Sequence, residues 1–188
     1  MFVYWLYIAF LLLYLGLVVA LFWYIVSLNL SWIFGAPFVP TSQNEAERIL
    51  SHIPLEKGAY MMELGCGDGR VLRTAAKMYG VRGMGVDIVY LWLIIARFWA
   101  WKDGQKNLQF VHKKIQNTDL RQAQGVYLFL MTKYINSIKD QMLSQLQPGT
   151  LVISHGFPVP YLADSQVDYL EAKRFSTYYY RISPRVQG

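Results

Sequence analysis

The first 44 residues contain no charged side chain, and this limits what that part of the chain can fold into. No Asp, Glu, Lys or Arg occurs from Met1 to Asn44, although the 188-residue chain has 18 Lys and Arg and 12 Asp and Glu. Residues 1–34 are longer than the roughly 20 apolar residues that cross a bilayer. We predict a transmembrane anchor at residues 1–34, and a domain at residues 35–188 that carries the whole formal charge of +6.

Flanking residues indicate how this segment sits in a membrane. Aromatic residues suited to the two interfaces lie toward its ends: Tyr4, Trp5, Tyr7, Trp23, Tyr24 and Trp32. A cleaved signal peptide is the alternative, but no Lys or Arg precedes the apolar run and no A-x-A site follows it. Arg48 is the cation nearest to the segment, which predicts a single-pass protein with a cytoplasmic domain. We expect a bacterial inner membrane rather than a mitochondrial one.

After Pro40, strand-like and helix-like patterns alternate along the chain. A capping box at Ser42 and Glu45 opens a short helix. Further helices are expected at 69–79, 89–102 and 134–146, and strands at 60–64, 81–87, 108–111, 126–130 and 150–154. Two β-rich runs, 167–172 and 176–182, follow with no helix between them. The pattern predicts an α/β fold, with a doubly wound, Rossmann-like, seven-stranded mixed sheet that ends in an antiparallel C-terminal hairpin.

The stretch ELGCGDGR, residues 63–70, follows the first predicted strand and opens a helix. Ligands of open α/β sheets bind at this edge. Arg70 stands where a dinucleotide fingerprint would have its third Gly, so a nicotinamide cofactor is disfavoured. Glu63 and Asp68 would repel a pyrophosphate but suit a cationic ligand, and Asp87 ends the next strand, where a carboxylate can bind ribose hydroxyls. These residues indicate a nucleoside with a positively charged, amino-acid-like arm.

Glu63 to Gly69, with Asp87, resembles motif I and the next acidic position of class I S-adenosylmethionine-dependent methyltransferases. Residues 37–42, 63–70, 96–104 and 146–160 resemble the seven-strand lysine methyltransferases, a group that includes the ATP synthase c-subunit lysine methyltransferase and broad-specificity archaeal enzymes. The resemblance implies S-adenosyl-L-methionine as cofactor. It implies that the cofactor contacts Thr41, Glu63, Gly65, Gly67, Asp68, Gly69 and Asp87. Many of these enzymes have an acidic residue just after the third strand that contacts adenine, whereas this chain has Lys113 and Lys114 there. Asn117 or Asp119 could make that contact instead.

The acceptor side of the site gives a weaker pattern. LFLMTKY, residues 128–134, lacks the [DN]-P-P-[FY] sequence of enzymes that methylate amide or adenine nitrogens. A lysine acceptor must instead lose its proton, which a desolvating aromatic mouth favours. The catalytic candidates follow the fourth and fifth strands: Thr132, Tyr134, Ser154 and His155. His155 would either take the proton or orient the amine. The alternative for His155 is a hydrogen-bonded loop residue without a catalytic role, and the alternative for Tyr134 is core packing.

Other functional classes have little support in the sequence. The three histidines show no ligand spacing, so no metal is expected, and Cys66 is the single cysteine. Basic residues occur singly or in pairs, so no nucleic-acid partner is expected despite a pI of 9.4. Residues 88–102 are apolar nearly all round. The outer face of this helix is expected to touch the lipid bilayer, with Arg97 and Lys102 reaching head groups, or else the anchor or a partner subunit.

These patterns together predict a membrane-anchored, S-adenosylmethionine-dependent protein-lysine N-methyltransferase that acts on a membrane-proximal protein. By resemblance, the ring subunit c of an ATP synthase is the favoured substrate. Two other classes stay open. A lipid or quinone methyltransferase would use the same cofactor half of the site, and a non-catalytic membrane scaffold could retain the fold.

Overall fold

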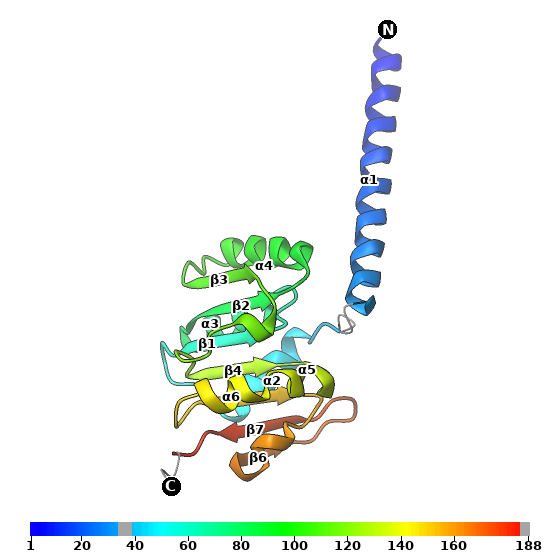
Figure 1. Cartoon of the computed structure of the whole chain (residues 1–188). Coiled ribbons are helices and arrows are strands. Elements are labelled where there is room, and N and C mark those ends of the chain that lie inside the picture. The colour runs from blue at the N-terminus through cyan, green and yellow to red at the C-terminus, as the bar shows by residue number, and fades with distance from the viewer. Residues whose placement is uncertain (34–38, 185–188) are drawn as a thin grey trace. The chain divides into compact units, whose positions relative to one another are not determined.

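The computed structural model describes residues 1–33 and 39–184 of the chain, which divides into two units, Met1–Phe38 and Val39–Gly188. In the first unit, α1 (Phe2–Ile33) is one continuous helix (Figure 1). Its stretch Phe2–Val26 is 25 residues long, reaches a mean hydropathy of 2.5 over an 18-residue window, and is long and apolar enough to cross a bilayer, as is the apolar helix of a signal sequence. The predicted boundary between residues 34 and 35 lies outside the described residues.

The second unit is built on the predicted seven-stranded mixed sheet. The strands are β1 (Tyr60–Leu64), β2 (Arg82–Asp87), β3 (Leu108–His112), β4 (Gly125–Leu128), β5 (Leu151–His155), β6 (Gln166–Leu170) and β7 (Thr177–Arg181). Their order in the sheet is β3-β2-β1-β4-β5-β7-β6. The first five strands run parallel, and β7 is antiparallel to both β5 and β6. The predicted fold class and terminal hairpin are therefore confirmed.

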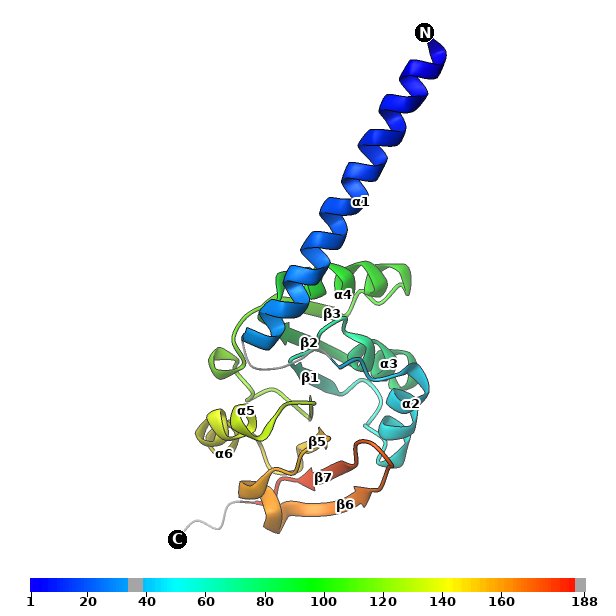
Figure 2. The ribbon, with the colours of Figure 1, turned by 90° about the vertical axis from the view of Figure 1, so that its right-hand side faces the viewer.

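Helices cover both faces of this sheet, and α2 and α3 lie on the opposite side from α5 and α6 (Figure 2). One apolar core lies under α2 (Gln43–His52), α3 (Arg70–Tyr79) and α4 (Tyr90–Lys102). The other lies under η1 (Ile115–Asn117), α5 (Thr132–Ser137), α6 (Lys139–Gln145) and η2 (Pro160–Ser165). Every buried residue of both cores belongs to the second unit.

Local sequence signals fix the ends of the first helices in this unit. The Ser42 side chain accepts a hydrogen bond from the Glu45 N–H at 3.2 Å, as expected of an N-cap. α3 starts after Gly69 and stops at Gly80, and both glycines lie in the left-handed region, at φ +68° and +64°. The Gly80 N–H donates to the Ala76 carbonyl and closes the last turn.

Two predicted elements differ from the structure. The single helix expected at 134–146 is two helices, broken at Ile138, where the backbone turns to φ −113° and ψ 13°. The Ser137 hydroxyl donates to the Tyr134 carbonyl at 2.8 Å, a local bond that competes with helix continuation. The strand expected to reach residue 130 ends at Leu128. Two residues further on, the Leu130 side chain packs on the backbone of Gly65.

Candidate active site

The glycine loop is held on the end of β2 by backbone hydrogen bonds. The Gly65 and Cys66 N–H groups donate to the Val86 carbonyl at 2.8 and 3.0 Å, and the Gly67 N–H donates to Asp87 Oδ2 at 2.9 Å. Gly65, Gly67 and Gly69 have φ of +77°, +51° and +68°, a region that side-chain-bearing residues rarely adopt. Three glycines are therefore required by the loop's own conformation.

Two of these glycines also leave room for neighbouring side chains. A Cβ on Gly69 would lie 2.3 Å from Phe110 Cε1, and one on Gly65 would lie 2.9 Å from Leu130 Cδ2. The Phe110 ring is confined from the other side as well, because a Cβ on Gly85 would lie 2.8 Å from its Cδ1. The loop is thus packed against β3 and against the chain that follows β4.

Glu63 is the most buried acid of the site, with 4% of its surface exposed. Its Oε2 accepts a hydrogen bond from the Leu72 N–H at 3.0 Å, so β1 is tied to the first turn of α3. Burial raises the pKa of Glu63 well above its usual value against the lowering effect of the Leu72 bond, and the negative charges of Asp68 and Asp87 raise it further. A cationic ligand group beside Glu63 would relieve this repulsion.

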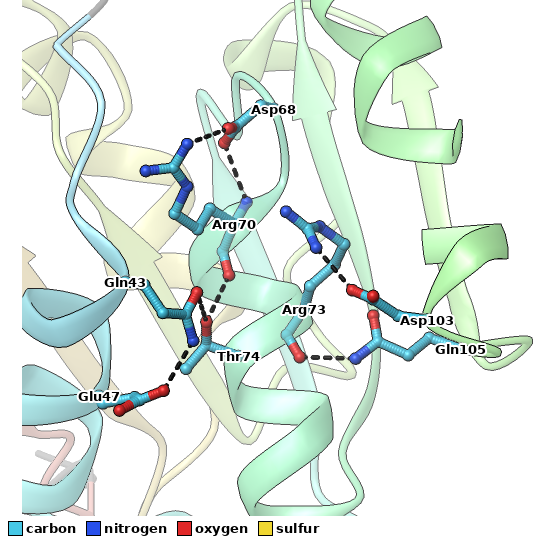
Figure 3. Close-up of polar contacts among 8 residues, drawn as sticks. All are labelled: Gln43, Glu47, Asp68, Arg70, Arg73, Thr74, Asp103 and Gln105. Atoms are coloured by element: carbon cyan, nitrogen blue, oxygen red, sulfur yellow. Dashed lines mark hydrogen bonds and ion pairs between the residues drawn. The ribbon is translucent and has the colours of Figure 1, made fainter. Parts of the chain in front are cut away.

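The other two acids organise the loop. Asp87 uses Oδ1 to accept from the Val89 N–H at 2.8 Å and Oδ2 to accept from Gly67, and burial raises its pKa. Asp68 forms an ion pair with Arg70 at 2.9 Å (Figure 3). Arg70 also donates to the Thr41 carbonyl at 3.1 Å. This arginine therefore connects Thr41, which is distant in sequence, to the glycine loop.

A second set of contacts fastens α2 to α3 beside this arginine. The Thr74 hydroxyl lies 3.3 Å from Gln43 Oε1, and the Gln43 amide donates to Glu47 at 2.8 Å (Figure 3). Thr74 also donates to the Arg70 carbonyl at 2.8 Å. The start of α2, and with it buried Thr41, is consequently held against the helix that the glycine loop opens.

A buried hydroxyl offers one more group to a ligand. Tyr127 lies beside Glu63 in the β1–β4 register and is 2% exposed. Among the described residues its hydroxyl has no partner at full hydrogen-bond geometry, and burial raises its pKa against the lowering effect of the nearby Thr41 side chain. Unsatisfied buried polar atoms are costly, so a polar ligand group or water here would be stabilising. Three neighbouring carboxylates and this hydroxyl fit a ligand whose end is cationic and rich in hydrogen-bonding groups, and Glu63, Asp68, Asp87 and Thr41 would hold it.

The four catalytic candidates do not form one cluster. Thr132 is the exposed first residue of α5, and Tyr134 is half-buried two residues later. Ser154 and His155 are neighbours in β5, so their side chains point to opposite faces of the sheet. The Ser154 hydroxyl is fully buried and donates to the Phe157 carbonyl at 2.6 Å. Its partner is thus the backbone of the loop that follows β5.

His155 belongs to an aromatic cluster on the α2 side of the sheet. Its ring centroid lies 4.5 Å from that of Phe129 and 5.8 Å from that of Phe175, and its Nδ1 lies 2.9 Å from Thr177 Oγ1. Burial lowers the pKa of His155 to about 4, which makes it a weak base toward a lysine ammonium of pKa about 10.4. The sequence analysis missed Phe129 and Phe175. The available signal was an aromatic residue directly after the fourth strand.

Comparison with known proteins decides the family. Residues 63–166 match the family model described as the ANTKMT methyltransferase domain. A protein-lysine N-methyltransferase of Saccharolobus islandicus is 31% identical over 132 residues, which are 69% of this chain and 82% of that protein. The chain belongs to this methyltransferase family. The mouse adenine nucleotide translocase lysine N-methyltransferase is 33% identical over 127 residues, and the match spans 66% of this chain and 54% of the mouse protein.

Solved structures agree with this assignment. An RNA methyltransferase from Salinibacter ruber, solved with S-adenosyl-L-homocysteine, has a TM-score of 0.73 and 26% identity, over 79% of this chain and 96% of that one. An S-adenosylmethionine-dependent methyltransferase of Aquifex aeolicus has a TM-score of 0.62 at 16% identity, over 73% and 89% of the two chains, which shows the fold alone. The predicted class I enzyme and its cofactor, S-adenosyl-L-methionine, are thereby confirmed.

The expected contact of Asn117 or Asp119 with adenine stays a prediction, and the structure shows the surroundings of Asp119. Asp119, a candidate to replace the missing acidic contact, is fully exposed and forms a bidentate ion pair with Arg121 at 2.6 to 3.1 Å. Arg121 holds the pKa of Asp119 down to about 2. The predicted contacts of site residues with the cofactor remain predictions, as do the catalytic candidates.

Within residues 1–33 and 39–184, no group of three or more His, Cys, Asp or Glu could hold a metal.

The low pKa of His155 predicts the pH profile of the methyltransferase. We expect His155→Asn to leave the apparent pKa of kcat unchanged within about 0.2 units between about pH 6 and 9, since His155 stays neutral over this range. Initial rates of methyl transfer across that range measure it. A shift of about one unit in the variant would identify His155 as the proton acceptor and contradict the expectation.

Proposed function

We propose that this methyltransferase is a membrane-anchored protein-lysine N-methyltransferase that acts on a protein close to the membrane. The observation that carries the acceptor class is the match to the archaeal protein-lysine N-methyltransferase, because it spans 82% of that enzyme and includes the glycine loop. The mouse relative, whose name also specifies a lysine acceptor, supports the same class. The uncharged helix at residues 2–26 supports the anchor.

The chemistry of the site is compatible with an amine acceptor. When bound, the cofactor supplies a methyl group to an in-line displacement and leaves as a neutral thioether, so no acid is required. The amine must approach without its proton, and desolvation by Phe129, Phe175 and neutral His155 would lower its pKa. Exclusion of water and alignment would then account for most of the rate enhancement.

A cleft beside this aromatic cluster supports a peptide substrate. It has a volume of about 710 Å³ and runs between the start of α2 and the β6–β7 turn. Its lining combines acids and bases: Glu45, Arg48, Glu171, Lys173 and Arg174, with Ser42, Asn44 and Ala172. Glu171 can attract the ammonium group of a lysine, whereas Glu45 is already paired with Arg48 at 3.5 Å and the charged lining sums to +1. Ser42 adjoins Thr41 at the cofactor side. We infer that the acceptor segment lies along this cleft.

Transfer of labelled methyl groups to membrane fractions tests the proposal. The full chain, with methyl-labelled cofactor, should label a protein whose intact mass rises in steps of one methyl, and a proteolytic map should locate the label on lysine. The ATP synthase c subunit, suggested by resemblance, and the substrate named for the mouse relative are the first two proteins to try. Label in lipid, quinone or RNA would contradict a protein acceptor, and absence of both label and cofactor binding would indicate a scaffold.

A further inference from the structure

The outer face of α4 exposes a continuous row of large apolar side chains. Tyr90, Ile94, Phe98 and Trp101 are 55%, 47%, 52% and 77% exposed, and we call them the α4 stripe. Their spacing of four, four and three residues puts them on one side of the helix. The opposite side is buried, because Trp92, Leu93, Ala96 and Ala100 face the sheet. α4 is therefore anchored in the fold while its apolar stripe remains uncovered.

The α4 stripe lies at the edge of the domain and is of moderate size. α4 lies beside β3, the edge strand of the sheet (Figure 2). With 150–250 Å² for each fully exposed aromatic side chain, the stripe presents roughly 500 Å² of apolar surface. Patches of this size on soluble proteins often bind a partner. A standard interface between two folded proteins needs about 800 Å² from each side, which the stripe does not reach.

Cations border the stripe, although one of them is not where the sequence suggested. Arg97 was expected to reach head groups, but its guanidinium donates twice to the Phe110 carbonyl, at 2.6 and 3.1 Å, and is held at the sheet edge. Lys102 is exposed, with its Nζ 4.7 Å from the Trp99 ring centroid, and Lys106 is exposed in the turn that follows. The C-terminal end of α4 thus combines indole rings with exposed lysine side chains.

We propose that the α4 stripe inserts into the head-group region of a bilayer that contains anionic lipid. This inference rests on the proposed membrane anchor. Residues 27–33 continue α1 and add about 10 Å, and residues 34–38 can span at most about 18 Å, so a bilayer that holds residues 2–26 would stay within reach of the second unit. Aromatic and aliphatic residues flanked by lysine are typical of helices that lie in an interface. The formal charge of +6, all outside the apolar span, favours anionic lipid.

Vesicle flotation of residues 39–188 tests the proposal without α1, because both apolar cores lie within this unit. The wild-type domain should float with vesicles of phosphatidylcholine and phosphatidylserine, and less with phosphatidylcholine alone. The double variant Phe98→Ser/Trp101→Ser should bind at least about tenfold more weakly, since two aromatic side chains no longer enter the interface. The matched control Met78→Ser/Val167→Ser removes exposed apolar residues outside α4 and should bind like wild type.

Results of two kinds would overturn the proposal, in flotation and in sedimentation. One is a wild-type domain that does not float with either vesicle, or a stripe variant that floats as well as wild type. The other is a dimer in sedimentation that the stripe variant dissociates, which would assign the stripe to a second copy. Cofactor binding by calorimetry should be unchanged in both double variants. Loss of vesicle binding with intact cofactor binding therefore separates this inference from the methyltransferase assignment.

Discussion

Glu63→Gln should weaken binding of S-adenosyl-L-methionine by about 100-fold and at the same time make the cofactor-free protein more stable to unfolding. A hydrogen bond to a charged group contributes about 1.5–3 kcal/mol, and about 2.7 kcal/mol corresponds to 100-fold in affinity. Gln retains the volume of Glu63, and its carbonyl oxygen can still accept from the Leu72 N–H. The loss would therefore reflect the missing negative charge, and calorimetric titration of the purified protein measures it.

The expected gain in stability follows from the raised pKa of Glu63. In the unfolded chain a Glu has a pKa of about 4.3, whereas the folded protein retains the proton to higher pH. Above pH 4.3 the unfolded state releases this proton first, so Glu63 makes the free energy of unfolding fall as pH rises toward the folded-state pKa. Gln has no such dependence. Denaturation of both proteins should give equal stability near pH 4 and an advantage for the variant that grows with pH.

Glu47→Gln is the matched control, because Glu47 is exposed on α2 and its carboxylate accepts only from Gln43 among the contacts described, while its backbone carbonyl accepts from Ser51. It should change neither cofactor affinity nor the pH dependence of stability measurably. Wild-type affinity in Glu63→Gln would refute the cationic-ligand role of Glu63. A stability profile parallel to wild type would mean that the Glu63 carboxyl ionises normally in the folded protein.

Much of the fold could be predicted because its signals are local. β1 occupies the predicted residues 60–64, since a buried run bounded by turn residues marks a strand from both ends. Gly80 ends α3 as expected because few other residues adopt its left-handed conformation. The break at Ile138 depends instead on the burial of Ile135 and Ile138 and on the hydrogen bond from the Ser137 hydroxyl to the Tyr134 carbonyl. The spacing of apolar residues along the sequence does not predict either.

The site was predictable only where strand geometry determines it. Glu63 and Asp87 end adjacent parallel strands, so their proximity followed from the order of elements. The Arg70 contact to Thr41 crosses 29 residues and depends on how α2 packs, which spacing does not specify. Ser154 and His155 could have been separated from sequence, because consecutive residues of a strand face opposite sides. Assigning both to one acceptor pocket neglected that alternation.

Gly69→Ala should lower the free energy of unfolding by about 3 kcal/mol and the Tm by roughly 6–12 °C. A positive φ costs a residue with a side chain about 1 kcal/mol. Gly80→Ala has this cost alone, because φ is +64° there and a Cβ would meet nothing within 4 Å. The remaining 2 kcal/mol or so is overpacking, because the new methyl would lie 2.3 Å from a Phe110 ring that Gly85 also confines. Thermal and chemical denaturation of the two variants would separate these costs.

The clash can be identified by a double-mutant cycle with Phe110→Leu, which removes the ring edge nearest to Gly69. If the ring is the obstacle, Gly69→Ala should cost about 1–2 kcal/mol less in the Phe110→Leu background than in wild type. Equal costs in both backgrounds, or a Gly80→Ala variant as unstable as Gly69→Ala, would show that backbone strain alone requires the glycine, with no contribution from packing against β3.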